Sequence, residues 1–141
     1  MTIEKRQLSE KNDNFIMLPT VDFCFKELMQ NKEVRKGILS ALLGKNPEEL
    51  EDTELLPTIL QPEYQDEKLG ILDVRVLFAD GTQTDLEMQV VQFDFWPNRV
   101  LFYLGKMYTG QIKRGEPYEK LKKCIHVSIL DFLHFPKDDR C

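Results

Sequence analysis

The 141-residue sequence has little cysteine, no long apolar run and no excess of positive charge, and each shortage argues against a class of protein. Its three cysteines, Cys24, Cys124 and Cys141, lie far apart without Cys-x-x-Cys spacing, which argues against a disulfide framework and a zinc site. No stretch approaches the ~18 apolar residues that a membrane span needs, and the first residues carry no apolar signal segment. We therefore expect a cytoplasmic protein that does not enter membranes.

The net charge is −5, from 24 acidic and 19 basic side chains. A dedicated nonspecific nucleic-acid binder usually carries a basic balance, so this sum argues weakly against one. The acids crowd residues 48–66, whereas a basic run comes late in the chain, at Lys106, Lys113, Arg114, Lys120, Lys122 and Lys123. That run predicts either a basic surface beside an acidic site or an ordinary solvated helix face with its loop.

What the chain does have is the composition of a soluble globular protein, with 42% hydrophobic and 30% charged residues. The first residues are polar and aperiodic, which predicts a mobile arm over residues 1–17. A chain of this length then forms a single domain, expected over residues 18–141.

The strongest local pattern is a pair of alternating runs on either side of Ala79-Asp80-Gly81, which predicts a β-hairpin. A two-residue loop would place charges and core residues on the same face. A three-residue loop with Gly81 in the left-handed bulge position sets Asp73 opposite Glu87 and Arg75 opposite Asp85. We predict this second register because it also gathers the apolar side chains on the other face, namely Leu72, Val74, Val76, Phe78, Leu86, Met88 and Val90.

In the predicted register Asp73 and Glu87 are like charges directly opposed, which costs a few tenths to ~1 kcal/mol unless a cation lies between them. Arg75 already faces Asp85, where a structural cross-strand ion pair is expected, so a metal is the available cation. The alternative is a pair of surface acids tolerated by solvent. Because side chains alternate along a strand, Gln89 shares a face with Glu87.

Helical spacing before the hairpin predicts either one helix with a break or two short helices. Thr20 is the expected N-cap of the first helical part, over residues 21–29. Asn31 is a candidate cap for the second part, and Gly44 stands in the usual C-terminal position.

The other elements follow from proline and glycine placement and from periodicity. Residues 54–60 contain a proline and predict an edge strand or a strand with a bulge. A late helix begins near Pro97 and ends at Gly110 or Gly115, before a last strand over residues 124–132. A helix between strands implies a right-handed crossover and a parallel pair, so we expect an α/β (α+β) fold with a mixed sheet flanked by helices.

Four stretches in this order carry a resemblance to a known family. They are Asp22-Phe23-Cys24-Phe25-Lys26, Leu72-Asp73-Val74, Asp85-Leu86-Glu87-Met88-Gln89 and Arg99-Val100-Leu101-Phe102-Tyr103. Over roughly residues 18–135 the chain resembles the bacterial recombination-promoting nuclease and putative transposase family (Rpn) of the PD-(D/E)XK nuclease superfamily. The resemblance implies a restriction-endonuclease-like αβββαβ core and a magnesium-dependent endonuclease that acts on DNA.

Carried over by position, the resemblance implies that Asp73 and Glu87 bind Mg²⁺ or Mn²⁺, with the Met88 backbone carbonyl as a third ligand. Asp22 would reach the metal from the side. Gln89 stands where the wider superfamily most often has lysine, although glutamine is usual in this family, and it offers hydrogen bonds without charge. Magnesium takes one or two carboxylates and keeps several waters, which suits this donor set.

The candidate DNA contacts are Arg99, which could meet a phosphate, Tyr103, which could stack or hydrogen-bond, and Lys106 from the basic run. Core packing of Tyr103 and plain solvation of Arg99 are comparable alternatives. A local salt bridge with Lys26 explains Asp22 as well as a metal site does.

Both histidines, His126 and His134, lack an acid or a nucleophile at a useful spacing and are expected to be structural. The leading prediction is a metal-dependent DNA endonuclease associated with recombination or transposition. The rival is a noncatalytic dimerising or regulatory module that keeps the nuclease fold. A homodimer would supply the two sites that cutting both strands often needs, although no residue demands it.

Overall fold

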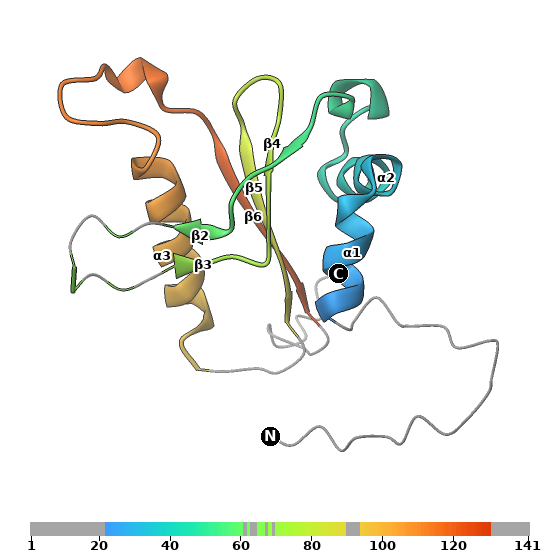
Figure 1. Ribbon diagram of the computed structural model, residues 1–141, viewed down its shortest axis with the longest axis horizontal. Helices are drawn as coiled ribbons and strands as arrows, with labels where there is room; N and C mark the ends of the chain where they lie inside the picture. Colours follow the sequence, from blue (N-terminus) through green and yellow to red (C-terminus); the bar gives the residue numbers. More distant parts are fainter. Residues whose placement is uncertain are drawn as a thin grey trace, which may run out of the picture.

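The computed structural model describes residues 22–60, 62, 65, 66, 68, 70–89 and 94–130, with the backbone alone at residues 22, 23, 70 and 71. The predicted arm over residues 1–17, the predicted Thr20 cap, Val90 and His134 lie outside the described residues. In the described part, helices cover both faces of a mixed sheet (Figure 1). The expected α+β class, with a mixed sheet flanked by helices, is confirmed.

Two short helices, α1 (Asp22–Gln30) and α2 (Lys32–Leu43), lie on one side of the sheet, and the 3-10 turn η1 (Pro47–Leu50) follows them. The helices are separate because Asn31 has an extended backbone, and its side chain accepts hydrogen bonds from the N–H groups of Glu33 and Val34. Gly44 ends α2 at a φ of 64°. The core on this side consists of Phe25, Met29, Leu39, Leu50, Val74, Val76, Phe78 and Leu86.

The main sheet has the strand order β1 (Glu54–Leu55), β4 (Val74–Leu77), β5 (Gln83–Gln89), β6 (Cys124–Leu130). β5 and β6 are parallel, as the crossover predicted, and the other neighbours are antiparallel. A separate ribbon pairs β2 (Ile59–Leu60) with β3 (Gly70–Ile71). The predicted strand over residues 54–60 is thus divided around Pro57, which cannot donate a ladder hydrogen bond.

The β4–β5 hairpin has the predicted three-residue loop. Arg75 faces Asp85 in the ladder, and the Phe78 N–H donates to the Thr82 carbonyl at 2.9 Å. Inside the loop, the Gly81 N–H donates to the Phe78 carbonyl at 3.0 Å, and Gly81 has a φ of 87°. A left-handed residue at the end of the loop is what this turn requires, so the register chosen from the apolar pattern is confirmed.

Leu72 is an exception to the predicted alternation. We expected it on the same face as Val74, but it packs in a second cluster with Leu60, Tyr103 and Met107. The reason is that the chain bends between β3 and β4, and the Leu72 N–H donates to the Thr58 carbonyl of the small ribbon at 2.9 Å. The period of two is therefore interrupted before β4 begins.

The opposite face of the sheet is covered by α3 (Trp96–Thr109), which begins with Pro97 in its first turn as predicted. The chain then passes through a loop that contains the short 3-10 helix η2 (Tyr118–Lys120) and enters β6. Within the described ranges, no helix is both long and apolar enough to cross a bilayer.

Candidate metal centre and its surroundings

Asp73 and Glu87 stand one position beyond the last ladder pair of the hairpin, Val74 with Leu86. The Oδ2 atom of Asp73 accepts a hydrogen bond from the Met88 N–H at 3.2 Å, which holds this carboxylate against β5. Asp73 is half-buried, whereas Glu87 is only 1% exposed. The two predicted carboxylates are therefore brought together, and the negative charge of Asp73 acts on Glu87.

Glu87 is an acid in an unfavourable place for a negative charge. Burial, Asp85 and Asp73 raise its pKa from 4.5 to about 7, while Arg99 and His126 oppose that rise. Neither carboxylate oxygen of Glu87 accepts a hydrogen bond from the described residues. A buried carboxylate without donors is costly unless it is protonated or meets a cation.

The donor set suits a hard divalent cation that keeps part of its water shell. The described residues contain no group of three His, Cys, Asp or Glu side chains arranged around a common point. A closed structural zinc site needs four such ligands, but Mg²⁺ is usually held by one or two carboxylates together with waters. Asp73 and Glu87, with the unsatisfied oxygens of Glu87, therefore fit Mg²⁺ or Mn²⁺.

Next to Glu87, a hydrogen-bonded chain runs across β5 and β6. Asp85 is fully buried, and its Oδ2 lies 2.7 Å from Nδ1 of His126. On the other side of the ring, Nε2 lies 2.6 Å from the hydroxyl of Ser128, and the Trp96 ring packs edge-on at 6.1 Å between ring centroids. Burial raises the pKa of Asp85, and the hydrogen bond and charge of His126 oppose that rise.

Two expectations about these residues were wrong. Arg75 was expected to form an ion pair with Asp85, but its guanidinium donates to Oε1 of Gln83 at 2.7 and 3.0 Å and to the Pro57 carbonyl at 3.3 Å. His126 was expected to lack an acid, but it pairs with Asp85. Both errors have one cause, because the parallel register of β5 and β6 places the imidazole directly beside Asp85.

The N-terminal half of α3 turns toward this site. Arg99 Nη2 lies 3.5 Å from Glu87 Oε1, and Arg99 Nε donates to the Tyr103 hydroxyl at 3.0 Å. The guanidinium also lies 5.4 Å from the Trp96 ring centroid and 5.2 Å from that of Tyr103. Tyr103 is only 8% exposed, so it occupies the core as in the alternative considered for it. The contact between Arg99 and Glu87 was not predicted.

The other predicted site residues are spread around this centre. Gln89, at the end of β5, is half-buried and follows Glu87 by two positions, so both face the same side of the strand. Asp22 is the first residue of α1, and its side chain is not among those that the structure describes.

Two surface pockets adjoin the sheet near these residues. One, of about 240 Å³, is lined by Lys26, Asp73 and Arg75 among others, so it gives access to Asp73 from the α1 side. The other, of about 390 Å³, is lined by Lys106 and Arg75 together with residues of the β2 region. Lys106 therefore lines a pocket beside β2 that includes neither Asp73 nor Glu87.

Comparison with known proteins gives one match. A family model described as "PD-(D/E)XK nuclease family transposase" matches residues 19–140. No curated protein and no solved structure gave a significant match. The matched range includes every described residue and agrees with the resemblance carried by the four sequence stretches.

Proposed function

Because the chain belongs to the PD-(D/E)XK nuclease family transposases, we propose that it is a metal-dependent endonuclease that hydrolyses phosphodiester bonds of DNA during recombination or transposition. One observation carries the proposal within this chain. Glu87 is 1% exposed, stands beside Asp73, and has two carboxylate oxygens without hydrogen-bond donors. A divalent cation at this point would offset both the burial of Glu87 and its repulsion from Asp73.

In this proposal Asp73 and Glu87 hold Mg²⁺ or Mn²⁺, the Met88 carbonyl is a third ligand, and Asp22 is a further candidate. When bound, the ion supplies a water of lowered pKa and neutralises charge on the scissile phosphate. Gln89 shares the strand face of Glu87 and orients the attacking water or a phosphate oxygen through hydrogen bonds. Because an amide brings no positive charge, Gln89 positions these groups without the charge balance that a lysine would give.

Arg99 is placed to serve the same reaction from the α3 side. Its guanidinium is held by Tyr103 and Trp96 and reaches the edge of the carboxylate pair, with 34% of its side chain exposed. An exposed guanidinium fork in this position can bind a phosphate oxygen of the substrate. Tyr103 then acts on the substrate only through Arg99, as a positioning residue.

The test combines metal binding with cleavage. Protein stripped with EDTA is titrated with MgCl₂ or MnCl₂ while its melting temperature and the heat of binding are followed. Supercoiled plasmid is then incubated with the same samples. We expect the wild type to gain stability with metal and to nick the plasmid. Asp73→Asn and Glu87→Gln should lose both effects, because each removes one anionic ligand while keeping the side-chain shape.

The matched control is Asp52→Asn, which removes one negative charge from an exposed site beside η1. It should behave as the wild type. If metal neither binds nor stabilises the wild type, and the two ligand variants resemble it in every assay, the noncatalytic module is the better description of this chain.

A further inference from the structure

A basic loop lies at the end of α3 opposite to Arg99. Residues 111–123, which follow α3, carry five basic side chains (Lys113, Arg114, Lys120, Lys122, Lys123) and two acidic ones (Glu116, Glu119). The segment 48–54, between α2 and the sheet, instead carries five acids and no base. The two segments lie on opposite sides of the sheet (Figure 1), so within the net charge of −5 a basic segment and an acidic segment are separated by the sheet.

The loop is held in one shape by its own hydrogen bonds. The Gln111 side chain accepts from the Lys122 N–H at 2.7 Å and donates to the Lys122 carbonyl at 2.9 Å, which fastens the two ends of the loop together. Glu116 accepts from the Lys113 N–H and from Lys120 Nζ, both at 2.7 Å. Gly115 provides the turn between them at a φ of 83°. A loop fixed in this way presents its side chains without a large ordering cost on binding.

The positive charges of the loop are largely available for a partner. Lys113, Arg114, Lys122 and Lys123 are exposed. The charge of Lys113 acts on Glu116, but none of the four forms an ion-pair contact with an acid within the part of the chain that the structure describes. Lys120, in contrast, is paired with Glu116. Tyr118 adds an aromatic ring that is 80% exposed. Exposed basic side chains and an exposed aromatic ring in one loop are features of surfaces that bind nucleic acids.

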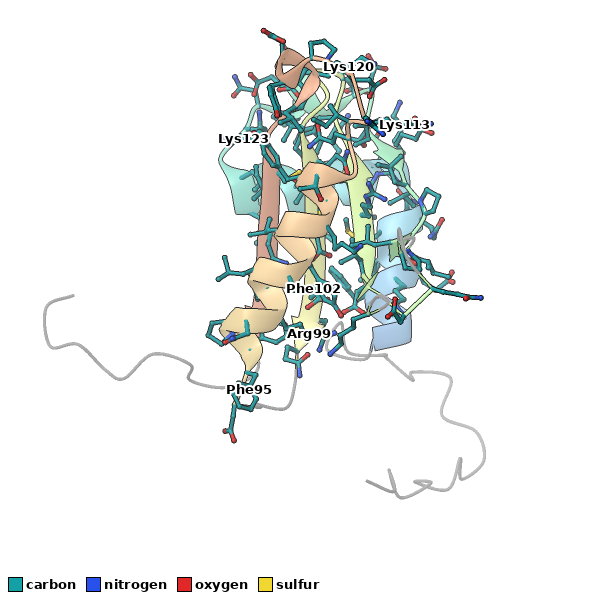
Figure 2. All side chains as sticks on the ribbon, turned by 90° about the vertical axis from the view of Figure 1, so that its left-hand side faces the viewer. Phe95, Arg99, Phe102, Lys113, Lys120 and Lys123 are labelled. Carbon is teal, nitrogen blue, oxygen red and sulfur yellow. The ribbon has the colours of Figure 1, made fainter. Side chains whose placement is uncertain are left out.

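Arg99 and the basic loop belong to the same side of the molecule. Figure 2 shows Arg99 near the lower end of α3 and Lys113, Lys120 and Lys123 at its upper end. The ten residue steps from Arg99 to Thr109, the last residue of α3, span about 15 Å at a rise of 1.5 Å per residue. At about 3.4 Å per base pair, this length corresponds to roughly four base pairs of duplex DNA, and the loop lies beyond it.

We propose that residues 111–123 form a second, sequence-independent contact to the DNA backbone, roughly four base pairs or more from the phosphate that Arg99 binds. The inference rests on the proposed function in taking duplex DNA as the substrate. The lysines of the loop bind phosphates and align the duplex along α3, while the acidic segment on the other side repels it. This contact sets how the duplex enters the site without selecting its sequence.

The test is DNA binding without cleavage, measured in EDTA by fluorescence anisotropy with a 16-base-pair duplex at 50 to 200 mM salt. The variant Lys113→Gln/Lys123→Gln removes two exposed charges from the loop. The control variant Lys32→Gln/Lys45→Gln removes two charges, one from the first residue of α2 and one just after its Gly44 cap, on the opposite side of the sheet. Melting temperatures of both variants confirm that they fold.

We expect the loop variant to bind more weakly with every duplex sequence. Its slope of log affinity against log salt should become less negative by about two, one for each lost phosphate contact. The control should keep the wild-type slope. Three outcomes would overturn the proposal. The slopes could be equal in all three proteins, or the control variant could change the slope as much as the loop variant does. The wild type could also bind anionic vesicles but not DNA.

The outcome is separable from that of the proposed function, because binding in EDTA does not need the metal site. Suppose that Asp73→Asn and Glu87→Gln lose cleavage while the loop variant keeps the wild-type slope. This result rejects the loop contact alone. Suppose instead that the slope changes in the loop variant but the wild type shows no metal-dependent cleavage. This result supports the loop as a DNA-binding surface and rejects the proposed nuclease activity.

Discussion

Arg99 and Glu87 form a contact between α3 and β5, with Nη2 of the arginine 3.5 Å from Oε1 of the glutamate. The arginine is fixed from behind, because its Nε donates to the Tyr103 hydroxyl and its guanidinium lies over the rings of Trp96 and Tyr103. Arg99 therefore holds a positive charge at the edge of a buried acid. It offsets part of the effect of burial on the pKa of Glu87, which otherwise favours the protonated carboxyl group.

The first prediction follows from this contact. Arg99→Gln should raise the pKa of Glu87 further above 7, because the variant removes a nearby cation and leaves the burial unchanged. The measurement is a pH titration of the side-chain carboxyl carbons by ¹³C NMR in metal-free protein, with Glu87→Gln used to assign the signal.

Two variants serve as comparisons. Arg99→Lys keeps the charge and should shift the titration less than Arg99→Gln. Lys106→Gln removes a positive charge about two turns further along α3 and should leave Glu87 near its wild-type value. A Glu87 signal that titrates at the same pH in Arg99→Gln and in the wild type would contradict the prediction.

The second prediction concerns the stability of the metal-free protein. Glu87 keeps its proton in the folded state up to about pH 7, whereas the unfolded chain releases it near 4.5. Between these values the folded state binds more protons, so its contribution to the free energy of unfolding falls as the pH rises. A shift of this size corresponds to about 3 kcal/mol, lost between pH 4.5 and 7 and constant above that range.

The measurement is urea unfolding in EDTA from pH 4 to 8, read as the difference between the wild type and Glu87→Gln. Glutamine cannot ionise, so the stability of the variant relative to the wild type should increase as the pH rises from 4.5 to 7. Glu48→Gln, in an exposed turn, should show no such gain. Addition of Mg²⁺ at pH 8 should restore stability to the wild type alone, since only the ionised Glu87 binds it.

The hairpin shows how much of the site the sequence could predict. Alternation of apolar residues, together with Gly81, selected a single register, and that register placed Asp73 next to Glu87. Antiparallel neighbours joined by a short loop are fixed by local rules, so their opposing residues can be read from the sequence. The caps at Asn31 and Gly44 were predictable for the same reason, since both depend on adjacent residues.

The contacts that were missed depend on chain segments far apart in the sequence. The pairing of Asp85 with His126 needs the register of a parallel crossover, which passes through α3 and a long loop and is not set by any turn. The hydrophobic pattern of β6 is consistent with several registers against β5. The position of Arg99 likewise depends on how α3 packs on the sheet, so its contact with Glu87 could not be derived from spacing.

The third prediction concerns the hydrogen-bonded pair of Asp85 and His126, which was not predicted from the sequence. His126→Ala should leave the fully buried Asp85 without its hydrogen-bond partner and reduce the free energy of unfolding by about 1–3 kcal/mol at pH 7, as expected for a buried acceptor left unsatisfied. Ser128→Ala removes only the hydrogen bond to Nε2 and should cost about 1 kcal/mol. Both values come from chemical unfolding followed by circular dichroism.

A double-mutant cycle separates the pair from the packing of the ring. In Asp85→Asn/His126→Ala the buried carboxyl group is absent, so the double variant should be more stable than the sum of the two single effects predicts, by at least ~1 kcal/mol. Simple additivity would mean that His126 stabilises the protein only by filling space beneath Trp96. A coupling of the expected size would instead show that the imidazole stabilises Asp85. Asp85 is then a second buried acid beside Glu87, where the proposed metal site concentrates negative charge.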